Sequence, residues 1–162
     1  RCAGGPATRR AESEKRAAAP PPSVVAMTTT IRYCHITVND LNESLAFYRD
    51  GLGLEVVNDV PYGEFRWVTL GNPDRQGTEV VLSEPHAGRS QADGDALQEL
   101  LTKGVLPMVI FSTDDLDTTF ERVRKVPGAE VLQEPIEQPW GPRDCAFRDP
   151  SGNMVRIEQA KA

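Results

Sequence analysis

The chain has 162 residues, with 18 Lys and Arg against 24 Asp and Glu, and so a net charge of −6. This length fits one domain and leaves little room for two. A content of 39% hydrophobic and 26% charged residues is typical of an ordinary soluble globular protein. The sequence lacks an apolar run near the ~20 residues that span a bilayer, which excludes a transmembrane protein. The acidic balance argues against nucleic acid as a partner, because nucleic-acid binding needs a basic surface.

Residues 1–26 differ in composition from the rest of the chain. Ala, Gly and Pro fill 13 of these positions, and five basic residues stand against two acidic ones, so the remaining 136 residues carry a net charge of −9. A segment with so little to bury cannot offset the entropy lost on ordering, and we expect it to be disordered. Met27 stands just before the first patterned segment, so we expect Met27 to be the natural start and residues 1–26 not to belong to the native protein.

Cysteine usage favours the cytoplasm. The three cysteines, Cys2, Cys34 and Cys145, show no CxxC spacing, and an odd number in a long chain is not typical of a disulfide framework. The simplest interpretation makes Cys34 and Cys145 small buried hydrophobic residues.

The body of the chain contains an internal repeat with a constant offset of 75 residues. The repeat is long, and two copies are too few for a solenoid, so it indicates a duplicated supersecondary unit. The matched pairs include Asp40 with Asp115, Leu41 with Leu116, Gly53 with Gly128, Glu55 with Glu130 and Gly77 with Gly152.

Each half predicts the same order of elements. Residues 32–38 alternate polar and apolar side chains, as a half-buried strand does. Asn39-Asp40 offers an N-cap with Glu43 as its capping box, and Leu41, Leu45 and Tyr48 then lie on one helix face. Further strands are expected at 54–60, 65–70 and 78–83. The second half predicts a strand at 107–113, a helix over 116–123 and strands at 129–133, 144–148 and 153–158.

The resulting fold class is α+β, with two βαβββ modules at 29–85 and 106–160 in a single domain over 29–160. A short amphipathic helix near 95–103 is expected to connect the modules. Two segments, ITVNDLNESLAFYRDGLGLEV (36–56) and FRDPSGNMVRIEQ (147–159), resemble the vicinal oxygen chelate superfamily, which contains glyoxalase I, bleomycin-resistance proteins and extradiol dioxygenases. The resemblance covers about residues 30–160. It implies curved mixed sheets around a ligand cavity, helices on the outside and a homodimer.

Strand alternation predicts which side chains face that cavity. Cys34, Ile36 and Val38 form the apolar set that packs under the helix, so their neighbours point the other way. The same logic in the other strands predicts a cavity lined by Tyr33, His35, Thr37, Glu79, Val81, Ser83, Met108, Ile110, Ser112, Met154, Arg156 and Glu158.

The resemblance also implies where metal ligands would stand, and the residues there are poor ligands. The four positions hold Tyr33, Val81, Met108 and Arg156, and a valine and a cation do not bind a divalent ion. We therefore expect no cofactor and disfavour a divalent metal. A register slip of two leaves open a remnant made of His35 and Glu79, with Glu158 as a third ligand.

The polar cavity residues suggest roles in acid–base chemistry and binding. His35 is either a structural histidine bonded to Glu79 or a tyrosine, or a general base, and we name His35 and Glu79 as candidate catalytic residues. Arg156 either pairs with Glu158 or holds an anionic substrate. Trp67 and Trp140 could each stack on a flat ligand. The alternative is packing in the core, and for Trp67 it is the favoured one. The candidate substrate-binding residues are Tyr33, Trp67, Ser112, Trp140, Arg143 and Arg156.

Three functions are compatible with this sequence. The first is a metal-independent protein that binds a small organic molecule, for drug sequestration or side-chain acid–base chemistry. The second is a metal-dependent glyoxalase-like lyase or dioxygenase. The third is a non-catalytic dimeric module. The sequence does not name the ligand.

Overall fold

The computed structural model describes residues 29–74 and 76–161. The expectations for residues 1–26 and for Met27 lie outside this part of the chain. Within it, none of the helices is long and apolar enough to cross a membrane.

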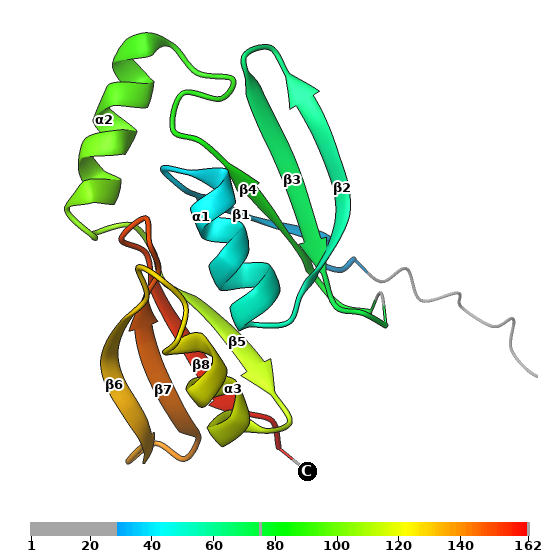
Figure 1. Ribbon diagram of the computed structural model, residues 1–162, viewed down its shortest axis with the longest axis vertical. Coiled ribbons are helices and arrows are strands. Elements are labelled where there is room, and N and C mark those ends of the chain that lie inside the picture. The colour runs from blue at the N-terminus through cyan, green and yellow to red at the C-terminus, as the bar shows by residue number, and fades with distance from the viewer. Residues whose placement is uncertain (1–28, 75, 162) are drawn as a thin grey trace, which may run out of the picture. The chain divides into compact units, whose positions relative to one another are not determined.

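The first half of the body folds as a strand, a helical segment and three further strands (Figure 1). Its four strands form one sheet in the order β1-β4-β3-β2, with β1 parallel to β4 and the other neighbours antiparallel. The elements are β1 (Tyr33–Thr37), α1 (Leu41–Leu45), the π-helix η1 (Ala46–Gly51), β2 (Glu55–Tyr62), β3 (Phe65–Gly71) and β4 (Glu79–Ser83).

The second half repeats this arrangement after the connecting helix α2 (Gln91–Thr102). Its sheet has the order β5-β8-β7-β6. The elements are β5 (Val109–Thr113), α3 (Leu116–Val123), β6 (Glu130–Glu137), β7 (Arg143–Arg148) and β8 (Met154–Gln159). The α+β class with paired βαβββ units is confirmed, and the two sheets remain separate rather than closing into one barrel.

The 75-residue repeat reappears in the strand register. His35 pairs with Val81 across β1 and β4, and Ile110 pairs with Arg156 across β5 and β8. His35 and Ile110 are 75 residues apart, and so are Val81 and Arg156. The repeated helices also start alike, because the carboxylates of Asp40 and Asp115 each accept backbone N–H bonds from their own first turn.

The connecting helix is longer than its apolar residues indicated. It starts at Gln91 rather than near residue 95, because Ser90 is the N-cap and its hydroxyl accepts a bond from the Asp93 N–H. The extra N-terminal turn is mostly exposed and polar, so hydrophobic periodicity carries no signal for it.

One hydrophobic core joins the two halves. The helix-facing residues of both sheets belong to it, including Val68 and Leu82 of the first sheet and Val155 and Ile157 of the second. The Phe47 and Phe147 rings meet across the halves at 6.4 Å. The alternating side chains on the other face of each sheet therefore point away from this core.

The DPSGN turn (Asp149–Asn153) also joins the halves. Its Asp149 carboxylate is buried and accepts a bond from the Tyr48 hydroxyl at 2.8 Å and from the Ser151 and Asn153 backbone N–H groups. The Asn153 amide donates to the Thr37 carbonyl at the end of β1. This network links the two segments that carry the family resemblance.

Candidate functional site

The face of the first sheet that points away from the core carries an aromatic cluster. We call this the first open face, and its aromatic residues include Tyr33, His35, Tyr62 and Trp67. The His35 and Trp67 rings are nearly perpendicular with centroids 5.2 Å apart, and the centroid of the Tyr62 ring lies 5.3 Å from that of Trp67. Trp67 therefore does not pack in the shared core. Its buried Nε1 has no hydrogen-bond partner among the described residues.

The candidate catalytic pair His35 and Glu79 shares this sheet, but the two side chains do not bond. In the register, Tyr33 is opposite Glu79, and His35 is opposite Val81. The Glu79 carboxylate faces Arg32 at 3.8 Å, and the Arg32 guanidinium lies over the Tyr33 ring. The structural alternative for His35, a bond to Glu79 or a tyrosine, is not what holds this histidine. Its described contact is the edge of Trp67.

The second sheet presents a polar network at the corresponding place, which we call the second open face. Arg156 makes a bidentate pair with Asp144 on the neighbouring strand β7, with both contacts at 2.8 Å. Glu158 is not its partner, since Asp144, opposite Glu158 across β7 and β8, takes both contacts. The Arg156 guanidinium holds the pKa of the Asp144 carboxyl below its usual range, and the Gln138 amide donates to the same carboxylate at 2.6 Å.

The remaining candidate binding residues are spread over the molecule. Ser112 is exposed on β5, opposite Glu158 in the register, and so shares the second open face. Arg143 does not, because it is on the other face of β7 and pairs with Asp117 of α3 at 2.7 Å. Trp140 is 71% exposed at the tip of the turn between β6 and β7.

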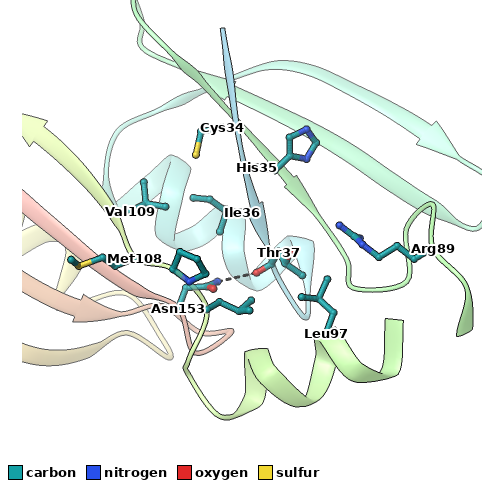
Figure 2. A pocket seen from close by; sticks show the side chains of 11 residues that line it. Cys34, His35, Ile36, Thr37, Arg89, Leu97, Met108, Val109 and Asn153 are labelled. Atoms are coloured by element: carbon teal, nitrogen blue, oxygen red, sulfur yellow. Dashed lines mark hydrogen bonds between the residues drawn. The ribbon is translucent and has the colours of Figure 1, made fainter. Parts of the chain in front are cut away.

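A cavity of about 310 Å³ lies between the two halves of the body (Figure 2). One wall is β1, where Cys34 is partly buried, and another is the segment that leads into β5. Helix α2 and the loop before it complete the cavity. It is lined by Cys34, His35, Ile36, Thr37, Arg89, Leu97, Leu106, Pro107, Met108, Val109 and Asn153.

Arg89 and Leu97 line the cavity although no sequence pattern predicted them there. Both lie in the connection between the modules, where the 75-residue repeat has no counterpart and strand alternation does not apply. Of the residues predicted to line a cavity, His35, Thr37 and Met108 line this one.

The donor set of the protein does not fit the metal centre that the fold family implies. Tyr33, Val81, Met108 and Arg156 stand at the implied positions, and Arg156 is already neutralised by Asp144. Among residues 29–74 and 76–161, no three His, Cys, Asp or Glu side chains gather closely enough to hold a metal ion. The remnant of His35, Glu79 and Glu158 is therefore not assembled in this part of the chain.

Comparison with known proteins gives the family. The model of the Glyoxalase/Bleomycin resistance protein/Dioxygenase superfamily matches residues 30–157, and the chain belongs to this superfamily. Among individual relatives, the uncharacterized protein YurT of Bacillus subtilis strain 168 is 35% identical over 126 residues, which are 76% of this chain and 94% of YurT.

Solved structures match the fold of this chain. The crystal structure of UcmS2 matches with a TM-score of 0.70 and 31% identity, over 83% of this chain and all of UcmS2. TnmS3, an antibiotic binding protein from Streptomyces sp. CB03234, matches in fold with a TM-score of 0.61 and 24% identity, over 83% of this chain and 98% of TnmS3.

Proposed function

We propose that this protein binds a small organic molecule in the cavity between its two halves and does so without a metal ion. The cavity itself carries the proposal, because 310 Å³ is within the size range of small-molecule sites. Its walls combine apolar side chains such as Leu97 and Met108 with a few polar groups, as such sites usually do. The antibiotic binding activity named for TnmS3 supports drug sequestration as one form of this function.

His35 is the residue through which binding could become catalysis. It borders the cavity, and its imidazole is not hydrogen-bonded to any other described residue, so a bound ligand can reach it. In that case His35 acts as a general base by side-chain chemistry alone. Glu79 points from the same face but does not line the cavity, so it is at most an auxiliary group.

Two further features of the proposal concern assembly and location. Both open faces carry exposed apolar side chains that a second copy would cover, which supports a homodimer. Cys34 and Cys145 are both free, as in a protein kept under reducing conditions, and this supports a cytoplasmic location.

A cavity-filling variant tests the binding site. We expect hits from a thermal-shift screen of metabolites and antibiotics on the wild-type protein, because a ligand that binds only the folded state raises its Tm. Leu97→Trp should abolish these shifts, since Leu97 lines the cavity. Leu100→Trp on the same helix is the matched control, because Leu100 is exposed and outside the lining. The absence of any shift across a broad panel would favour a non-catalytic module.

Elemental analysis distinguishes the metal-independent proposal from the metal-dependent alternative. We expect purified protein to contain no stoichiometric transition metal and its ligand-induced shifts to survive treatment with a chelator. One equivalent of zinc, iron or nickel per chain would overturn the metal-independent proposal and favour a glyoxalase-like lyase or dioxygenase.

A further inference from the structure

Arg89 stands at the edge of the cavity and is held there by the loop that carries it. Its Nη1 donates to the carbonyl oxygen of Pro85 at 3.1 Å and to that of Ala87 at 3.2 Å. The Arg89 backbone N–H also bonds to the His86 carbonyl. These bonds within one turn fix the position of the guanidinium before any ligand binds, and a fixed side chain loses less conformational entropy on binding.

The other edge of the guanidinium is available to a ligand. Its Nε and Nη2 make no hydrogen bond to any described residue, while Nη1 is already used. Figure 2 shows the guanidinium directed toward β1, on the side of the cavity where His35 is placed. Nε and Nη2 together present two parallel N–H groups, and this geometry matches the two oxygens of a carboxylate.

The charge on the described cavity lining is positive. The chain contains 24 Asp and Glu residues, yet none of the eleven lining residues is acidic. Among the lining residues, Arg89 carries a permanent positive charge. An anion in this cavity therefore meets favourable groups, although the protein as a whole is acidic.

The rest of the lining determines what must be attached to that anion. Leu97 of α2 and the residues Leu106, Pro107 and Met108 supply the apolar part of the lining, with Met108 on the side of the cavity opposite Arg89 (Figure 2). A ligand that fills the cavity must therefore be polar at one end and apolar over most of its length.

We propose that the ligand is an organic carboxylate with an apolar, ring-sized body, whose carboxylate is bound by Nε and Nη2 of Arg89. The inference rests on the proposed small-molecule function and names the chemical class of its ligand. Arg89 is the residue that selects this class, and His35 supplies a second polar contact beside it.

Three probes of one shape test the selection. Naphthalene-2-carboxylate, naphthalene-2-carboxamide and 2-naphthylmethylammonium share a ring system and differ in charge. Calorimetry on the full chain should show the carboxylate binding at least tenfold more tightly than the amide, with the ammonium weakest. In Arg89→Gln the preference for the carboxylate should fall to about onefold, whereas Arg89→Lys keeps the charge without the fork and should lie between.

The controls separate this inference from the proposed function. Arg124→Gln removes an exposed guanidinium that pairs with Glu121 on α3, away from the cavity, and should bind all probes like the wild type. If probes bind and Leu97→Trp abolishes binding, but the amide equals the carboxylate or Arg89→Gln keeps the preference, the carboxylate inference is overturned while small-molecule binding stands. If the broad panel yields only neutral or cationic ligands, the inference is also overturned. If neither the probes nor the panel bind, the proposed function fails and the inference fails with it.

Discussion

Tyr48 shows how one side chain links the sequence motifs to the fold. It is fully buried, and its hydroxyl donates to the Asp149 carboxylate from 101 residues away at 2.8 Å. Burial, together with the negative charge of Asp149, raises the pKa of the Tyr48 phenol well above its ordinary value. The tyrosine must therefore stay neutral for the two halves to remain joined at this point.

Replacing Tyr48 by Phe should lower the free energy of unfolding by about 1–2 kcal/mol at pH 7, because the Asp149 carboxylate loses a buried donor. Above pH ~10 the tyrosine of the unfolded wild type ionises while the folded one does not, so wild-type stability falls as pH rises through this range. Tyr48→Phe removes that contribution, so its stability should fall less steeply between pH 9 and 11 in urea titrations. Tyr62→Phe, at an exposed tyrosine, is the control and should keep the wild-type slope. Equal slopes for wild type and Tyr48→Phe would contradict the assignment.

At the scale of residues, strand alternation predicted which face of the sheet a side chain is on, but not which residue it pairs with. Placing His35, Ser112 and Arg156 away from the core needed only the period of two along each strand. The partner of Arg156 depends on the register of β7 against β8, which puts Ala146 opposite Arg156 and Asp144 opposite Glu158, and no local pattern reveals this register. Arg143 was named as a binding residue from its place in a turn, and the structure pairs it with Asp117 of α3. No repeat or alternation in the sequence indicated that Arg89 borders the cavity.

Helix α2 contains a glycine at a position where alanine, usually the more stable residue in a helix, should be the less stable one. Gly94 is buried in the first half of the helix, and a Cβ at this position would lie 2.6 Å from Cγ of His86, with His86 Cδ2 closer still. The His86 ring is held there by Asp95, whose Oδ1 lies 2.9 Å from Nε2. Glycine in the helix is therefore required by the loop that packs on it, and this same loop carries Arg89.

Gly94→Ala should lower the free energy of unfolding by about 1–3 kcal/mol, because the added methyl group displaces the His86 ring. In a His86→Ala background the same substitution should instead raise stability by about 0.5–1 kcal/mol, the ordinary gain of alanine over glycine in a helix. Urea unfolding of the four proteins measures both effects. A stabilising Gly94→Ala in the wild-type background would show that the ring does not occupy this position.

At the scale of elements, the repeat and the caps were the most informative signals. The 75-residue offset predicted two copies of one unit, and Asp40 and Asp115 predicted both helix starts. The helix after Asp40 changes to a π-helix at Ala46, which the spacing of Leu41, Leu45 and Tyr48 does not show, because these residues stay buried in either helix type. The start of α2 depends on Ser90, a single cap in an exposed segment.

At the scale of the whole molecule, both open faces leave apolar side chains in solvent. Met108 and Ile110 on the second open face are 52% and 54% exposed, and Tyr62 on the first is 50% exposed. The shared core is formed entirely on the helix sides of the sheets, so nothing within the described part of the chain covers these residues. Exposed apolar patches of this kind are typical of an interaction surface.

If a second copy covers these faces, a charge placed on one of them should separate the copies. We expect light scattering to give the wild-type protein a mass near twice 17.8 kDa and Ile110→Glu a mass near one chain. Ile110 is outside the core, so the free energy of unfolding of the monomeric variant should reflect only the lost association. Leu100→Glu places the same charge on an exposed leucine of α2 away from both faces and should remain a dimer. A monomeric wild type at micromolar concentration, or a dimeric Ile110→Glu, would show that the open faces are not the interface between copies.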